Sequence, residues 1–148
     1  MKVIILMGSD SDRPWCDTIE AALKEWDIPA EQVVGSAHKV PEKVLDLINQ
    51  TNQEDDIVFV TVAGRSNALS GVVAANSVHP VLACPPFKDK SDLLVNIHST
   101  MQMPSETPVL TVLDPNNVAG SAARIFGVSD KNVKQKVKDR IKSIKDKF

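Results

Sequence analysis

The sequence has few cysteines, and they form no pattern that indicates a metal site. Cys16 and Cys84 are the only two in 148 residues, they make no CxxC pair, and no cluster of cysteine and histidine surrounds them. This argues against a zinc site and a disulfide scaffold, and it is typical of a protein from the reducing cytoplasm. We expect Cys84 to be a buried thiol rather than a nucleophile, because no base is paired with it in the sequence.

Long apolar runs are missing too. The longest have about half a dozen residues, whereas a membrane-spanning helix needs about 20. The first run, Val3–Met7, leads directly into a glycine without a small-residue cleavage site, so it predicts a strand and not a signal peptide. The patterns GxxxxGK[ST] and GxGxxG are absent as well, which disfavours ATP and NAD as ligands. We expect no metal and no cofactor.

Apolar runs alternate with helical patterns along the chain. Strands are predicted at 3–7, 33–34, 57–62, 81–84 and 109–113. Helices are predicted between and after them, with apolar stripes made by Trp15, Ile19, Ala22, Leu23 and Trp26, by Val44, Leu45 and Ile48, and by Leu93, Leu94 and Ile97 behind a cap at Ser91. This alternation predicts an α/β fold over residues 1–128, a three-layer doubly wound parallel sheet of flavodoxin-like type.

The C-terminal segment 129–148 is a predicted amphipathic helix of a different character. It carries eight Lys or Arg and three Asp from residue 130 onward, a local charge of +5 in a chain of net charge −2. Its apolar stripe is narrow and consists of Val133, Val137, Ile141, Ile144 and Phe148. We expect it to dock on its own domain or on a neighbouring subunit; a partly disordered tail is the alternative. Nucleic acid and membranes are disfavoured as partners, because no aromatic or arginine cluster accompanies the charge.

Three polar loops follow predicted strands, at Met7–Asp12, Ser36–Lys39 and Ala63–Asn67. The carboxyl ends of parallel strands meet at one edge of a sheet, so these loops should form a single site. Serine hydroxyls and a helix N-terminus in the first loop favour a phosphate. Asp12 suits a ribose hydroxyl pair, or it only caps a helix.

The second loop places an imidazole beside an ammonium group. His38 can take and give a proton near neutral pH, and Lys39 can neutralise a phosphate. The alternative is a structural histidine, which is the role we expect for His79 and His98. In the third loop, Gly64, Arg65 and Ser66 can present successive backbone N–H groups to an anion.

Five motifs in register resemble the aminoimidazole ribonucleotide carboxylase (PurE-type) family of purine biosynthesis. They are Met7–Asp12, Ser36–Lys39, Ala63–Asn67, Cys84-Pro85-Pro86 and Met103-Pro104. Lys39 in place of the arginine of the mutase branch, and Ala68 in place of its loop histidine, resemble the class II branch that uses CO2 directly. Glu106 is a departure, because relatives usually have glycine there, and it leaves the shape of that segment open.

The resemblance implies an enzyme that adds CO2 to C4 of 5-aminoimidazole ribonucleotide (AIR) without metal or ATP. His38 would be the catalytic base. The substrate-binding residues would be Ser9, Ser11, Asp12, Ser36, Lys39, Gly64, Arg65, Ser66 and Asn67. It further implies a cytoplasmic homo-oligomer, either a tetramer or an octamer.

Three alternatives stay open from the sequence. The first is the mutase of the same family, which moves a carboxylate from the exocyclic nitrogen to C4. The second is a non-catalytic nucleotide-binding module of flavodoxin-like fold. The third is a phosphosugar isomerase, although the second acid-base group it would need is not evident.

Overall fold

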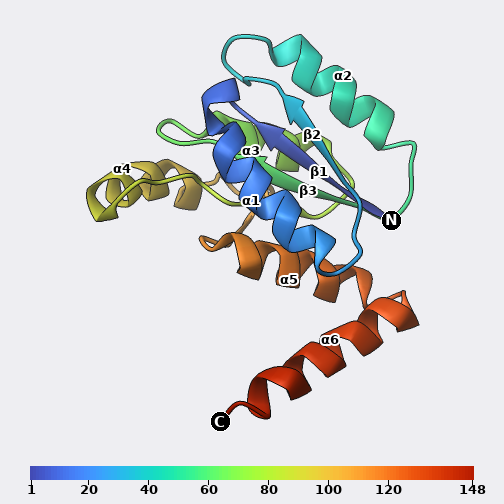
Figure 1. Cartoon of the computed structure of the whole chain (residues 1–148). Coiled ribbons are helices and arrows are strands. Elements are labelled where there is room, and N and C mark those ends of the chain that lie inside the picture. The colour runs from blue at the N-terminus through green and yellow to red at the C-terminus, as the bar shows by residue number, and fades with distance from the viewer.

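A five-stranded parallel sheet forms the centre of the molecule (Figure 1). The computed structural model describes residues 1–148. Its strands are β1 (Lys2–Met7), β2 (Ala30–Val34), β3 (Ile57–Val62), β4 (Val81–Ala83) and β5 (Leu110–Thr111). The spatial order is β2-β1-β3-β4-β5, and every neighbouring pair is parallel. This order is that of the flavodoxin-like doubly wound fold, so the predicted fold class is confirmed.

Helices cover both faces of the sheet. They are η1 (Asp10–Asp12), α1 (Arg13–Lys24), α2 (Pro41–Thr51), α3 (Ala68–Asn76), α4 (Lys90–Met101), α5 (Pro115–Phe126) and α6 (Lys131–Lys145). On one face, α1 and α5 pack on Val3, Ile5 and other odd-numbered β1 positions. On the other, α2 and α3 pack on Ile4 and Leu6. Strands buried on both faces explain why β1 and β3 are continuous apolar runs rather than alternating ones.

The C-terminal helix α6 begins against α5 and then leaves the body of the molecule (Figure 1). Val133 is buried in the α1–α5 core, whereas Ile141, Ile144 and Phe148 are exposed. Lys136 pairs with Asp27 at 2.6 Å, which holds the pKa of that aspartate below its usual value. The predicted apolar stripe is therefore buried at Val133, half-buried at Val137 and exposed from Ile141 onward.

Two predicted helical stripes are partly wrong. In α1 Cys16 is fully buried, whereas the Trp15 indole is only half-buried, packed against both the core and Phe87. In α2, Leu45 is exposed. Each residue lies at the margin of its helix's apolar arc, where the exact roll of the helix on the sheet decides exposure, and that roll is set by tertiary packing.

The stripe predicted for α4 is only partly correct, because Leu93 and Ile97 are half-buried and Leu94 is exposed. Leu94 is 62% exposed, and the buried residues of this helix are Asn96 and Thr100. The helix begins at Lys90 with Asp89 as its N-cap, not with Ser91: the Asp89 carboxylate accepts the backbone N–H groups of Ser91 and Asp92. A carboxylate two residues upstream of the predicted cap satisfies these donors as well as a serine would.

The last strand is shorter than predicted, with two residues in place of the five from 109 to 113. It pairs only with the short strand β4, so few ladder positions are available to it. None of the helices is both long enough and apolar enough to cross a membrane.

Glu106 adopts the left-handed backbone conformation, with φ of 65°. Glycine is the residue that tolerates this region best, which accounts physically for the glycine expected from the family resemblance. A side chain there costs about 1–2 kcal/mol, and glycine's greater freedom in the unfolded chain returns part of this. We predict that Glu106→Gly raises the free energy of unfolding by about 0.5–1 kcal/mol in urea denaturation, whereas Glu106→Ala does not. Equal stability of the two variants would refute the strain.

A candidate active site at the carboxyl ends of the strands

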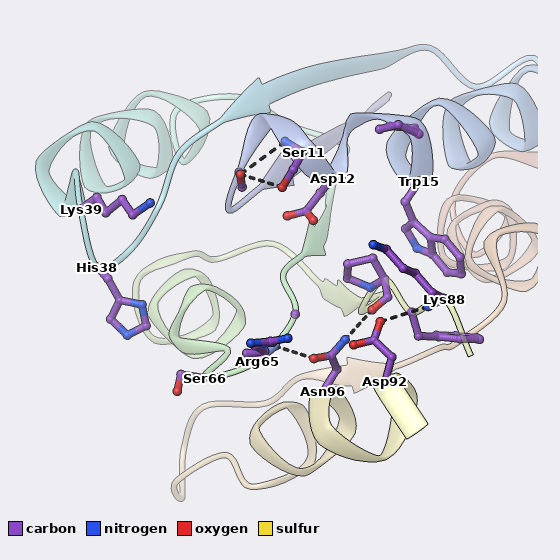
Figure 2. Close-up of a pocket in the computed structure, with 15 residues that line it drawn as sticks. Ser11, Asp12, Trp15, His38, Lys39, Arg65, Ser66, Lys88, Asp92 and Asn96 are labelled. Atoms are coloured by element: carbon purple, nitrogen blue, oxygen red, sulfur yellow. Dashed lines mark hydrogen bonds between the residues drawn. The ribbon is translucent and has the colours of Figure 1, made fainter. Parts of the chain in front are cut away.

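The three polar loops meet in one open pocket of about 830 Å³ at the carboxyl end of the sheet (Figure 2). The predicted site residues that line it are Ser9, Ser11, Asp12, His38, Lys39, Gly64, Arg65 and Ser66. Figure 2 shows His38 and Lys39 on one side, with Trp15 and Lys88 opposite them. Ser36 lies in an adjoining hollow of about 160 Å³, which His38 and Ser66 also line. Residues far apart in sequence are thus brought together as the parallel topology requires.

The first loop is folded tightly around Ser9. Its hydroxyl oxygen accepts the backbone N–H of Ser11 at 3.3 Å and the Ser11 hydroxyl at 2.9 Å, so the two serines form one polar surface. Asp12 is the N-cap of α1, but its carboxylate makes no capping hydrogen bond. The interpretation that Asp12 only caps the helix is therefore not supported, and its carboxylate faces the pocket (Figure 2).

Burial raises the pKa of the Asp12 carboxyl above its usual value, and the nearby Ser9 backbone offsets part of that rise. Lys39, Arg65 and Lys88 also line the pocket, against the carboxylates of Asp12 and Asp92. Cations therefore outnumber carboxylates in the lining, which suits an anionic ligand such as a phosphate monoester.

The second loop is a turn immediately after β2. The Ser36 hydroxyl accepts the backbone N–H of Lys39 at 3.3 Å and holds the turn closed. His38 is exposed and has no hydrogen-bond partner in the chain, so both ring nitrogens are open to a ligand. The other two histidines lie elsewhere: His79 pairs with the Thr51 carbonyl at 3.0 Å, and His98 is exposed on α4.

The third loop offers two free backbone donors, not the three predicted. The Arg65 N–H donates to the Asn96 side-chain oxygen at 2.8 Å. The N–H groups of Gly64 and Ser66 donate to no atom of the protein, and both residues line the pocket. Sequence alone does not reveal this, because the residue that takes the middle donor lies 31 positions away on another helix.

Asn67 is the one predicted site residue that lines neither the pocket nor the adjoining hollow. It is buried, and it caps α3 by accepting the backbone N–H of Ser70. Its amide nitrogen donates to the hydroxyls of Ser70 and Thr100. The carboxamide is thus fully occupied within the protein, so it is not available to a ligand in this geometry.

The wall opposite His38 was missed by sequence reasoning. It consists of Pro14, Trp15, Pro86, Phe87, Lys88, Asp92 and Asn96. Trp15 was predicted to be a core residue, and Pro86 was noted only as part of a motif. A polar Asn96 and Thr100 pair, four residues apart in a helix with apolar neighbours, was the available signal for a polar face at this position.

The two cysteines are predicted to be inert in the folded protein. Burial raises the pKa of both Cys16 and Cys84 to about 12, and the Trp15 indole N–H points at the Cys84 sulfur at 3.4 Å. Thiolates are the reactive species, so iodoacetamide at pH 8 should label neither residue in native protein and both in denaturant. Mass spectrometry resolves the two sites. Rapid native labelling of Cys84 would contradict its assignment as a buried structural thiol.

Comparison with known proteins agrees with this geometry. The family model described as AIR carboxylase matches residues 2–147. The chain belongs to the AIR carboxylase family. It is therefore an enzyme of the carboxylase and mutase family of purine biosynthesis.

Individual relatives of this AIR carboxylase family member carry both activity names. Phosphoribosylaminoimidazole carboxylase of Archaeoglobus fulgidus is 47% identical over 93% of the chain and 75% of that protein. The human bifunctional carboxylase and succinocarboxamide synthetase is 40% identical over 95% of the chain, which spans 33% of that longer protein. N5-carboxyaminoimidazole ribonucleotide mutase of Pyrococcus horikoshii is 34% identical over 97% of the chain and 82% of that protein.

The crystal structure of Treponema denticola PurE superposes with a TM-score of 0.90 at 40% identity, covering 98% of this chain and 92% of that one. The fold and the family are thereby established together.

Proposed function

We propose that this protein is a phosphoribosylaminoimidazole carboxylase, which adds CO2 to C4 of AIR to give 4-carboxy-5-aminoimidazole ribonucleotide in purine biosynthesis. The observation that carries the proposal is the pocket itself. A single pocket is lined by hydroxyls and cations suited to a phosphate, by an aspartate whose carboxylate makes no capping hydrogen bond, by a free imidazole and by two free backbone N–H groups. These are the groups that a nucleotide and CO2 require.

The ribonucleotide is held by the first two loops. Ser9, Ser11 and Lys39 bind the 5′-phosphate, and Lys39 supplies the positive charge. Asp12 accepts the ribose hydroxyls through its carboxylate, which is not engaged in capping. Ser36 supports this arrangement indirectly, because its hydroxyl closes the turn that carries Lys39.

Carbon–carbon bond formation takes place between the second and third loops. The electron-rich C4 of AIR attacks the carbon of CO2, and one C=O bond of CO2 becomes the carboxylate. The free N–H groups of Gly64 and Ser66 donate to the oxygens as their negative charge grows. His38 then removes the proton from the tetrahedral C4, which restores the aromatic ring. AIR and CO2 thus give the product and one proton.

The reaction needs neither a metal ion nor ATP, because C4 of AIR is already nucleophilic and CO2 is an adequate electrophile once it is held in place. Initial rates should therefore be unchanged by EDTA and by omission of ATP. We place the reaction in the cytoplasm, consistent with two buried cysteines that are both free thiols.

The mutase is the second candidate, favoured by the Pyrococcus horikoshii relative. The pocket argues for the carboxylase, because His38 is its single histidine and Ala68 stands in the adjoining hollow at the position where the mutase branch carries its own. Two assays separate them: AIR with bicarbonate and CO2, and N5-carboxylated AIR with a trap for released CO2. Product in the first assay alone supports the carboxylase. Direct conversion in the second assay assigns the mutase. If neither assay gives product, the non-catalytic nucleotide-binding module becomes the favoured interpretation.

The chain is proposed to act as a homo-oligomer, either a tetramer or an octamer. Leu94, Val95 and Met101 on α4 are each about 60% exposed, and Leu110 of the edge strand is exposed beside them. The proposed C-terminal unit 129–148 contains α6, and its exposed residues Ile141, Ile144 and Phe148 add further apolar surface. Such surface is typical of contacts between subunits. Light scattering after size-exclusion chromatography distinguishes the two assemblies from a monomer.

A further inference from the structure

Polar side chains of the helix α4 hold the third loop, Ala63–Asn67, in place. The Asn96 side-chain oxygen accepts the Arg65 N–H at 2.8 Å, and its amide nitrogen donates to the Pro86 carbonyl at 2.8 Å (Figure 2). The Ser99 hydroxyl donates to the Arg65 carbonyl at 3.2 Å and accepts the Asn67 N–H at 2.9 Å. Asn96 alone joins the loop to the opposite wall of the pocket.

The loop needs this restraint, because its backbone is strained. Arg65 has φ of 32°, in the left-handed region that side chains rarely adopt. Such a residue costs about 1–3 kcal/mol and persists only where neighbouring contacts hold it. The contact with Asn96 is also close: a Cβ added at Gly64 would lie 3.2–3.3 Å from the Asn96 carboxamide. A side chain at position 64 would therefore require the Asn96 carboxamide to shift by a few tenths of an ångström.

We infer that Asn96 is a positioning residue for carboxylation: it binds the middle N–H of the loop and thereby aims the N–H groups of Gly64 and Ser66 at CO2. This inference rests on the proposed function. Asn96 is 4% exposed, and both halves of its carboxamide are used. Its effect should fall on the chemical step, because the phosphate and ribose groups are bound by other loops.

The chain contains a matched control. Asn52 makes the same pair of bonds at the opposite end of the sheet: its oxygen accepts the Val78 N–H at 3.1 Å, and its nitrogen donates to the Asn76 carbonyl at 2.8 Å. Its loss removes the same two kinds of hydrogen bond from a more exposed position and does not touch the pocket. A purely structural role for Asn96 would give the two alanine variants the same kinetic behaviour.

The experiment measures kcat and KM for AIR at saturating CO2, with melting temperatures, for wild type, Asn96→Ala and Asn52→Ala. We expect Asn96→Ala to lower kcat by about 10–10²-fold, the cost of misplacing groups that stabilise developing charge, with KM for AIR changed less than about threefold. Asn52→Ala should keep kcat within about twofold, and it should lose less stability than Asn96→Ala because its hydrogen bonds are more exposed. Faster exchange of the Arg65 amide proton in Asn96→Ala would report the released loop directly.

Ser99→Ala covers the case in which Asn96→Ala does not fold. It removes the hydrogen bonds between the partly exposed Ser99 hydroxyl and the same loop. It should lower kcat by about three- to tenfold. With an active wild type, undiminished kcat in Asn96→Ala would overturn this inference and leave the proposed function standing. Where Asn96→Ala does not fold, undiminished kcat in Ser99→Ala would do the same. A wild type that carboxylates no AIR would overturn the proposed function, and this inference with it.

Discussion

The His38→Asn variant is expected to carboxylate AIR about 10²–10⁴-fold more slowly than wild type, the range in which a positioned general base contributes. His38 is the only imidazole in the pocket, it is held at the end of β2, and it has no partner within the protein. Asparagine keeps a polar side chain of similar reach but cannot take the C4 proton at neutral pH. The loss should appear in kcat, measured by product formation at saturating AIR and CO2.

The control for this variant is His98→Asn. His98 is exposed on α4 and lies outside the pocket lining, so its replacement should leave the rate unchanged. Melting temperatures equal to that of wild type for both variants would show that neither disturbs the fold. Near-normal turnover by His38→Asn would remove this residue from the mechanism and leave the pocket without a base.

The Asp12→Asn variant is expected to raise KM for AIR by about 10–10²-fold. A hydrogen bond to a charged group contributes about 1.5–3 kcal/mol, which corresponds to this range of affinity. Asparagine preserves the shape of the side chain and offers one acceptor oxygen, but without the negative charge. Direct titration of AIR binding in the absence of CO2 measures this effect separately from catalysis. Unchanged affinity would mean that the ribose is held elsewhere.

The pH dependence gives Asp12 a second, independent signature. Burial raises the pKa of its carboxyl, so as the pH falls the residue is protonated sooner than an ordinary aspartate, and AIR binding should weaken with it. The substrate phosphate also takes up a proton near pH 6. Comparison with Asp12→Asn isolates the aspartate, because the variant retains only the phosphate's contribution.

The same raised pKa predicts the stability of the unbound variant. A carboxyl that is harder to ionise in the folded state costs stability as the pH rises past its unfolded pKa. At neutral pH, unliganded Asp12→Asn should therefore be at least as stable as wild type. The weaker binding of AIR is then a loss of recognition, not of folding.

The fold was predictable because its signals are local and continuous. The strand β3 consists of six buried residues from Ile57 to Val62, and the sequence pattern predicts it with the same bounds. Proline near the start of α1 and of α2 marks both helices. Once strands and helices alternate, handedness and connectivity rules leave few topologies other than the observed one.

The loops of the site were predictable for the same topological reason, since polar residues at the ends of β1, β2 and β3 must converge. What was not predictable is how their backbone groups are used. Whether the Arg65 N–H is free depends on Asn96, and whether Asn67 faces a ligand depends on Thr100. Both answers come from α4, whose polar inner face contradicts the apolar stripe expected from its leucines.

The wall formed by Trp15 and Phe87 shows a further limit of sequence patterns. Trp15 has the spacing of a core residue, and its ring does pack, with centroids 5.1 Å from those of Phe87. It packs against the core but is only half-buried there, and it also lines the pocket. An amphipathic pattern identifies an apolar side of a helix without saying which apolar neighbour it meets.

The central claim, direct use of CO2 at C4 of AIR, is tested most directly by following one carbon atom. The enzyme is given N5-carboxylated AIR that carries ¹³C in its carboxylate, in the presence of a large excess of unlabelled CO2. The ¹³C content of the product is then measured by mass spectrometry. A carboxylase can use that compound only after it has released its labelled CO2, so we predict product without ¹³C. Product that retains the label would show a direct transfer within one nucleotide and would contradict the account.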